Sequence, residues 1–315
     1  MSLAPRVSVV IATYNRSNVL RHTLTSLLSQ TVADFEAIVV GDACSDDTAE
    51  VVASFSDPRL VFRNLAANVG DQSGPNNVGM AAARAPVIAF LNHDDLWFPD
   101  HLERGLALLD AEADVALAGW VRGPAPERVV AARGAYSPHQ NVPASAWVFR
   151  AGLRETVGPW RHRRELFNIP SQDWLFRAYR KGLRLRHTGI PTLLVVNSVV
   201  DAGSYALRLE ERQAAYLEAM RDPAFRERLE PAAPAAPSLS SRLFRRRDAR
   251  SAARTASYLV RSAPERLLSR IAPRFGISPL AVTNVFRFGF RRGEFLERLR
   301  HRRGLPHEAH GMLDE

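Results

Sequence analysis

The chain has 315 residues, of which 46% are hydrophobic and 24% charged, and it carries a formal net charge of +9. This is enough apolar sequence for one large core plus an appendage, and the single cysteine, Cys44, excludes an intrachain disulfide, which fits a reducing compartment. No apolar run approaches the roughly 20 residues that span a bilayer, and the run at residues 7–12 is too short for a leader, so we expect a cytoplasmic protein.

The first 120 residues alternate between apolar strands and amphipathic helices. Continuous apolar runs suit parallel strands that are covered on both faces, and apolar residues at helical spacing predict helices. The predicted strands are residues 7–12, 35–40, 60–63, 87–91 and 115–120, and the predicted helices are residues 18–29, 48–55, 77–84 and 99–110. The alternation predicts an α/β fold with an open, mostly parallel sheet and helices on both faces.

After residue 120 the sequence becomes irregular and is punctuated by Gly and Pro. The elements predicted beyond this point are strands at 146–149 and 193–196 that rejoin the sheet, a helix at 173–181 ended by Gly182, and a polar helix at 206–220. A Pro-rich stretch then favours a linker. We expect a main domain over residues 1–230, a linker over 231–241 and a basic helical region over 242–315.

The positive charge is concentrated in the last of these parts. Residues 242–315 hold 17 Arg and 7 acidic residues, a net charge of +10, whereas the rest of the chain carries −1. Arg alternates there with apolar residues, and basic amphipathic segments bind anionic membrane surfaces. The alternative is a small helical subdomain packed on the main domain. Nucleic-acid binding is not expected, since no recognised module is present.

Carboxylates follow the ends of two predicted strands. Asp42 follows the strand at 35–40, and Asp94 and Asp95 follow the strand at 87–91. Carboxylates at strand ends of an α/β sheet gather in the crevice where ligands bind, and their hard oxygens suit Mg²⁺ or Mn²⁺, which bind phosphate-bearing substrates. A third acid, Asp173, comes later in the chain.

Several landmarks resemble family 2 glycosyltransferases, which have the GT-A fold. They are VVIATYNR at residues 9–16, VVGDACSDDT at 39–48, NVG at 68–70 and 77–79, and FLNHDD at 90–95 followed by Trp97 and Pro99. Each is weak alone, but the order and spacing together are specific. The resemblance is close over residues 7–102 and looser to about residue 200. It implies that residues 1–230 form a GT-A catalytic domain.

The resemblance implies a site for a nucleotide diphosphate sugar. An aromatic ring just past the first strand can flank the base, and Asp42 can accept hydrogen bonds from the base or ribose. Asp94 would ligate the Mn²⁺ or Mg²⁺ that neutralises the leaving diphosphate, with Asp95 beside it. The expected donor-binding residues are Thr13, Tyr14, Arg16, Asp42, Asn77, Asn92 and Asp94, and the expected metal ligands are Asp94 and Asp95.

The chain departs from the family pattern in two places. Asn92 stands where the family has the first acid of its Asp-x-Asp motif, which lowers the negative charge of the site. Asn76 stands where the family often has Arg before Asn77, so a cationic contact to the nucleotide is missing or comes from Arg16 or Arg84.

Asp173 resembles the general base in the family's Glu-Asp-Trp segment. In an inverting transfer the acceptor hydroxyl loses its proton as it attacks, so a carboxylate has to face the sugar opposite the diphosphate. The alternative is a helix N-cap. The expected acceptor-binding residues are Trp160, Gln172 and Trp174, although either tryptophan can serve packing instead.

Together these features predict an inverting, metal-dependent glycosyltransferase that uses a UDP- or GDP-linked sugar. The expected acceptor is a glycan or lipid-linked glycan in bacterial surface polysaccharide synthesis, at the inner face of the membrane. The alternative is a non-catalytic nucleotide-sugar-binding or scaffold protein on the same fold. A nucleotidyltransferase is disfavoured, because residues 13–16 lack a Gly-rich phosphate loop.

Overall fold

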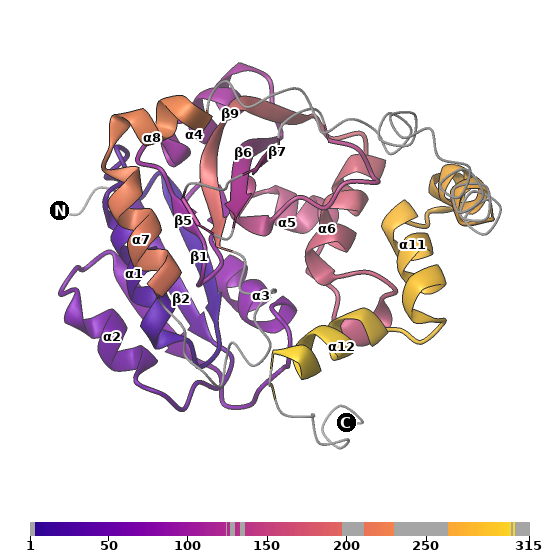
Figure 1. Cartoon of the computed structure of the whole chain (residues 1–315), viewed down its shortest axis with the longest axis horizontal. Coiled ribbons are helices and arrows are strands. Elements are labelled where there is room, and N and C mark those ends of the chain that lie inside the picture. Colours follow the sequence, from indigo (N-terminus) through magenta and orange to yellow (C-terminus); the bar gives the residue numbers. More distant parts are fainter. Residues whose placement is uncertain are drawn as a thin grey trace, which may run out of the picture.

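The computed structural model describes residues 4–123, 125–126, 130–132, 136–196, 211–229, 264–303 and 305. These residues form a nine-stranded sheet in the order β3-β2-β1-β4-β8-β6-β9-β5, with β7 paired to β6. In Figure 1, α1, α2 and α7 lie on one side of this sheet and α3, α5 and α6 on the other. The predicted α/β class, with helices on both faces, is confirmed.

The strands are β1 (Val7–Thr13), β2 (Phe35–Gly41), β3 (Leu60–Asn64), β4 (Val87–Phe90), β5 (Leu96–Trp97), β6 (Val115–Gly123), β7 (Val130–Ala132), β8 (Trp147–Arg150) and β9 (Leu185–Val196). The helices are α1 (Ser17–Leu28), α2 (Thr48–Ser54), α3 (Ser73–Ala82), α4 (His101–Ala111), α5 (Leu153–Val157), α6 (Pro170–Arg180), α7 (Glu211–Met220), α8 (Pro223–Leu229), α11 (Pro279–Phe288) and α12 (Glu294–Arg302).

The first half of the sheet is parallel, and this places its strand ends together. Strand β1 lies between β2 and β4, with Thr13 opposite Gly41 and Val10 opposite Phe90. All residues of β2 and β4 are buried, as expected for strands covered on both faces. The segments that follow β1, β2 and β4 therefore leave the sheet at the same edge, where ligands bind in this architecture.

The second half of the sheet is mixed. Strand β8 runs antiparallel to both β4 and β6, while β6 and β9 are parallel. Strand β9 is longer than the predicted 193–196, because residues from Leu185 onward also pair with β6. The predicted mostly parallel arrangement therefore describes the first half of the sheet better than the second.

Two helices begin earlier than the sequence predicts. Helix α3 begins at Ser73 rather than at residue 77, and α6 begins at Pro170 rather than at 173. Proline fits the first helical position because its fixed φ is helical and it needs no hydrogen-bond donor there. Residues 206–210 of the predicted polar helix and the predicted linker at 231–241 lie outside the described residues.

Close packing of α3 against β1 depends on Gly79. A Cβ atom at this position would lie 2.2 Å from Cγ1 of Val10, so only glycine lets the helix approach this strand so closely. An aromatic cluster fills the space between β4, β8 and α6. Its members in ring contact are Phe90, Phe149, Trp147, Trp160 and Trp174.

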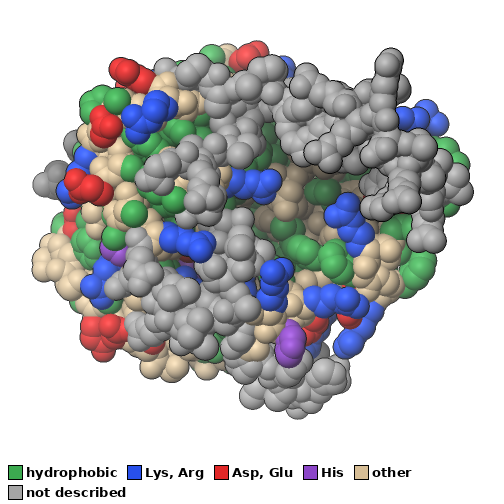
Figure 2. Space-filling model, in the orientation of Figure 1, with side chains coloured by type: hydrophobic (Ala, Val, Ile, Leu, Met, Phe, Trp, Pro, Cys, Tyr) green, Lys and Arg blue, Asp and Glu red, His purple; other side chains and the backbone are tan. Residues whose placement is uncertain are grey.

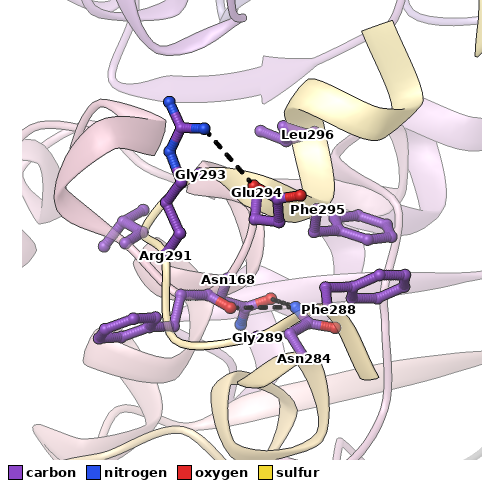
Figure 3. Close-up of a pocket in the computed structure, with 11 residues that line it drawn as sticks. Asn168, Asn284, Phe288, Gly289, Arg291, Gly293, Glu294, Phe295 and Leu296 are labelled. Carbon is purple, nitrogen blue, oxygen red and sulfur yellow. Dashed lines mark hydrogen bonds and ion pairs between the residues drawn. The ribbon is translucent and has the colours of Figure 1, made fainter. Parts of the chain in front are cut away.

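The C-terminal helices α11 and α12 pack against the segment that leads into α6. The amide of Gly293 donates to the carbonyl oxygen of Leu166 at 2.8 Å, and Asn284 Nδ2 donates to the carbonyl oxygen of Phe167 at 3.2 Å. Figure 3 shows this contact, with Asn284 and Asn168 facing each other beneath the turn between the two helices. No helix in the described ranges is long and apolar enough to cross a bilayer.

Candidate active site

A cavity of about 680 Å³ opens at the edge where β1, β2 and β4 end. Its size is within the usual range for small-molecule sites. Five of the residues expected to bind the donor line it: Thr13, Tyr14, Asp42, Asn92 and Asp94. The residues predicted from sequence at the ends of β1, β2 and β4 therefore line the same cavity.

Asp42 is fixed by the turn that faces it. Its Oδ1 accepts a hydrogen bond from the amide of Val69 at 2.7 Å, and its Oδ2 accepts one from the amide of Gly70 at 2.9 Å. Burial raises the pKa of Asp42 to about 6, although these amides and the nearby charge of Arg300 lower it. The carboxylate is thus held in place, 5% exposed, at the cavity wall.

The two acids after β4 have different environments. Asp94 lines the cavity, whereas Asp95 is 2% exposed and its Oδ2 accepts hydrogen bonds from Asn92 Nδ2 at 2.9 Å and Ser145 Oγ at 2.5 Å. Burial, together with the neighbouring charge of Asp94, raises the pKa of Asp95 to about 8. Asp94 is therefore the acid placed at the cavity wall, whereas Asp95 is engaged with Asn92 and Ser145, and its expected role as a metal ligand stays a prediction. Burial also lowers the pKa of His93 to about 4, which keeps this ring neutral.

The site fits a metal ion only if the substrate supplies most of the ligands. Among the described residues, no group of three or more His, Cys, Asp or Glu side chains is placed to hold an ion. Magnesium and similar ions at phosphate sites are commonly held by one or two carboxylates together with substrate oxygens and water. Asp94, at the cavity wall, is the carboxylate that suits this arrangement.

Three other expected donor contacts are not part of the cavity lining. Arg16 is 1% exposed and is not part of the lining, and Arg84 pairs with Glu36 at 2.8 Å. Asn77 is engaged with Trp160, since its Nδ2 donates to that residue's carbonyl oxygen at 2.9 Å and its Oδ1 accepts from the amide at 2.8 Å. In this geometry Asn77 joins α3 to the loop before α6 rather than contacting a donor.

Asp173 lies in the first turn of α6, two residues beyond Ser171, which lines the cavity. Its carboxylate accepts a hydrogen bond from Arg177 Nε at 2.8 Å and lies 3.8 Å from Arg161 Nη1. The N-cap of α6 is Ile169, so the alternative reading of Asp173 as the cap is wrong. The carboxylate is near the cavity but is not part of its lining.

The expected acceptor-binding residues are all buried. Trp160 and Trp174 are 2% and 0% exposed and belong to the aromatic cluster, so neither ring has a face open to a sugar. Gln172 is 2% exposed, and its amide exchanges two hydrogen bonds with the backbone of Val142. In this geometry these side chains pack against neighbouring residues, and their expected contact with an acceptor stays a prediction.

The structure adds lining residues that the sequence reading missed. Asp71, whose Oδ2 accepts from the amide of Arg163 at 2.9 Å, lines the cavity beside Asp42. Trp120 and Arg122, at the end of β6, line the side toward α6. Trp120 is the last residue of the predicted strand at 115–120, and this aromatic side chain at a strand end was the one sequence signal for these lining residues. Helix α12 also contributes to the lining, and nothing local in the sequence indicates this.

Comparison with curated proteins gives partial matches. The chain is 37% identical over 107 residues to the succinoglycan biosynthesis protein ExoO of Rhizobium meliloti, which covers 34% of this chain and 30% of that protein. It is 32% identical over 103 residues to the UDP-Glc:alpha-D-GlcNAc-diphosphoundecaprenol beta-1,3-glucosyltransferase WfgD of Escherichia coli, which covers 33% of this chain and 40% of that protein. The chain thus matches about a third of the length of such relatives.

Solved structures share the fold. The Staphylococcus aureus protein TarS, residues 1–349 in complex with UDP-GlcNAc, aligns with a TM-score of 0.52 at 20% identity, over 67% of this chain and 61% of that chain. A mannosyltransferase, PcManGT from Pyrobaculum calidifontis, in complex with GDP-Man and Mn²⁺, aligns with a TM-score of 0.52 at 17% identity, over 91% and 88%.

The model of the family "Glycosyl transferase family 2" matches residues 8–185. This range runs from β1 to the start of β9, and it includes the strand ends around the cavity as well as Asp173. Because the match covers more than half of the chain, the protein belongs to glycosyltransferase family 2.

Proposed function

We propose that the protein transfers a sugar, with inversion, from a nucleotide diphosphate sugar to a hydroxyl group of a glycan or lipid-linked acceptor. The observation that carries this is the single cavity that joins Asp42 to Asp94 at the carboxyl ends of parallel strands. Two structures of the same fold, in complex with UDP-GlcNAc and with GDP-Man, support a UDP- or GDP-linked donor.

The donor would lie along this edge of the sheet. Tyr14 lines the cavity next to Thr13 and would flank the base, and Asp42 would accept hydrogen bonds from base or ribose. The diphosphate would then reach Asp94. A bound Mn²⁺ or Mg²⁺ would neutralise the departing diphosphate. In this proposal Asp95 orients Asn92 and Ser145 behind the metal position.

Asp173 is the proposed general base. An acceptor hydroxyl that enters along the first turn of α6, past Ser171, would meet its carboxylate. The ion pair with Arg177 fixes the carboxylate from the following turn of the helix. Trp120 lines the cavity and replaces Trp160 and Trp174 as the aromatic side chain available to an acceptor sugar.

The stereochemical course tests this proposal directly. A UDP- or GDP-linked α-sugar, incubated with the protein, Mn²⁺ and an acceptor mixture, should give a β-linked product, which nuclear magnetic resonance of the anomeric proton identifies. An α-linked product would rule out a single displacement, and with it the role of Asp173 as the base.

A second function is favoured by two observations, the amide of Asn92 in place of a carboxylate and the placement of Asp173 outside the cavity lining. A protein that binds nucleotide sugars without transferring them would need neither a carboxylate at position 92 nor a general base in the cavity lining. Such a protein would bind a donor tightly in calorimetry and would neither hydrolyse it nor transfer its sugar to any acceptor, whereas the proposed enzyme would do at least one of these.

The pKa of Asp42 predicts a pH dependence. Because burial raises this pKa to about 6, the carboxylate form that accepts hydrogen bonds from the donor increases as the pH rises through about 6. We expect kcat/KM for the donor to rise over the same range, since this ratio reports groups of the free enzyme. In Asp42→Asn the amide does not titrate, so the step at about pH 6 should disappear. The same step in the variant would assign it to another group.

The C-terminal region is proposed to contact an anionic membrane surface. Of the eight large hydrophobic side chains that are exposed among the described residues, six lie between residues 267 and 290, including Phe275 at 76% and Phe290 at 85% exposure. Arginines at 266, 270 and 274 are exposed between them. Apolar side chains among cations suit the interface of an anionic bilayer. The reference to diphosphoundecaprenol in the name of WfgD supports a lipid-linked acceptor.

Vesicle binding tests this surface. The protein should sediment with vesicles that contain phosphatidylglycerol and not with pure phosphatidylcholine, and salt should weaken the binding. Replacing both Phe275 and Phe290 with Ser should reduce sedimentation, whereas Val61→Ser, at an exposed position on β3, should not. Equal binding of the double variant, or none by the wild type, would contradict the assignment.

A further inference from the structure

Helix α12 is anchored to the loop before α6 by an ion pair between buried Arg163 and partly exposed Glu297. Nη1 of Arg163, whose side chain is 0% exposed, lies 2.6 Å from Oε1 of Glu297. The amide of the same arginine donates to Asp71, which lines the cavity. At the start of the helix, Gly293 has a φ of +75° and lies against the carbonyl of Arg163, a position that favours glycine. The helix is therefore tied to the wall of the cavity and does not extend into solvent.

From this anchor, the last turn of α12 faces the strand ends. Leu296 and Leu299 line the cavity, as do four arginines, Arg298, Arg300, Arg302 and Arg303. In Figure 2, Lys and Arg side chains gather beside the hollow on this face, on the side where Figure 1 shows α12.

Two of these arginines lie close to the acids of the site. Arg300 Nη1 donates to the carbonyl oxygen of Gly70, whose amide in turn donates to Asp42. The positive charge of Arg300 lowers the pKa of Asp42, and that of Arg303 lowers the pKa of His93, the residue before Asp94. Both arginines are half-buried, whereas Arg298 and Arg302 are exposed. Arg300 and Arg303 thus lie near the two ends of the line from Asp42 to Asp94.

The arginines reverse the charge of the cavity. Without residues 294–305, the lining holds three carboxylates and one cation, Arg122, and so has a net charge of −2. The four arginines of the C-terminal segment bring it to +2. A diphosphate is negatively charged on both phosphates, so the cavity without this segment would repel it, and the complete cavity attracts it. The planar guanidinium group of arginine also carries several N–H donors, which form bidentate hydrogen bonds with phosphate oxygens.

We propose that α12 is part of the donor site, and that Arg300 and Arg303 bind the diphosphate of the nucleotide sugar. This rests on the proposed function and extends it to a segment outside residues 8–185, which the family model matches. It also supplies a cationic contact to the diphosphate, which Asn76 does not provide. The positive wall compensates for the reduced metal site at Asn92, since it neutralises the same phosphates.

Calorimetric titrations with UDP, GDP and inorganic pyrophosphate test the proposal. Each of Arg300→Ala and Arg303→Ala should weaken binding about tenfold, as expected for one charge-assisted contact, and the double variant should weaken it further. Raising the salt concentration should weaken the wild type more than the double variant. Arg287→Ala, at an exposed position on α11 outside the cavity lining, should bind like the wild type.

A third variant loosens the helix without removing a cavity arginine. Glu297→Ala breaks the ion pair with Arg163, and it should also weaken pyrophosphate binding. Circular dichroism and melting curves would show that the catalytic unit remains folded. If the variants bind as tightly as the wild type, α12 is not part of the site, and if they bind more tightly, the helix obstructs the site instead. Either result would overturn the inference.

The outcomes separate this inference from the proposed function. If the wild type binds UDP or GDP and the arginine variants bind equally well, only the role of α12 falls. If the wild type binds pyrophosphate through these arginines but binds no nucleotide, the nucleotide-sugar function falls and the anion site remains. If it binds none of the three probes, both fall.

Discussion

Replacing Asp173 with Asn is expected to lower the rate of sugar transfer by about 10²- to 10⁴-fold, the usual contribution of a general base, while the Kd for the donor stays unchanged. An amide cannot accept the proton of the attacking hydroxyl, but it can keep a hydrogen bond with Arg177 Nε. The donor cavity is built from other residues and should be unaffected. Steady-state kinetics with varied donor, together with calorimetry, measure both quantities.

The control for this variant is the same substitution of Asp by Asn in a second Asp–Arg ion pair. Asp114 pairs with Arg184 at 3.0 Å, away from the cavity, and Asp114→Asn should leave kcat unchanged. A parallel loss in both variants would indicate a general effect on folding, which melting curves would reveal. Full transfer activity in Asp173→Asn would show that another group, or the substrate itself, removes the proton.

The second large effect is expected at Asp94. Removal of its carboxylate in Asp94→Ala should abolish the response to Mn²⁺ and reduce transfer by at least about 10²-fold, because metal stabilisation of a leaving group is worth several kcal/mol. The activity should be measured over a range of Mn²⁺ and Mg²⁺ concentrations. Asp94→Ala with unchanged, metal-dependent activity would overturn the assignment.

Asp95 provides the matched comparison. In Asp95→Asn the side-chain oxygen can still accept hydrogen bonds from Asn92 and Ser145, and the buried carboxyl group, whose pKa is raised to about 8, is already neutral at pH 7. This variant should keep most of its activity and its metal response. If Asp95→Asn lost the metal response as Asp94→Ala does, Asp95 would be a ligand despite its burial.

The parts of the site that could be predicted from sequence are those encoded locally. Strands β1, β2 and β4 are apolar runs, and parallel pairing of such runs forces the residues after them to one edge of the sheet. For this reason the sequence alone predicts that Tyr14, Asp42 and Asp94 lie together, and all three line the cavity.

The role of a side chain could not be predicted where burial or long-range packing decides it. Trp160 and Trp174 have the rings that a sugar site needs, but nothing in their local sequence says whether those rings face a cavity or the core. Arg300 contacts Gly70 across 230 residues, a pairing that no local pattern encodes. The basic charge of the C-terminal region is visible in the sequence, yet its contribution to the cavity depends on how α12 packs.

The proposed enzyme binds a nucleotide diphosphate sugar in the cavity between Asp42 and Asp94. The most direct measurement is a thermal-shift screen of UDP- and GDP-linked sugars, with and without Mn²⁺, and with the free sugars as controls. A donor present at about 100 times its Kd adds about 2.7 kcal/mol to the free energy of unfolding, so it should raise the melting temperature clearly. We expect at least one nucleotide sugar to do so, more strongly with Mn²⁺, and the free sugars not to. A melting temperature that no nucleotide sugar changes, with or without the metal, would contradict it.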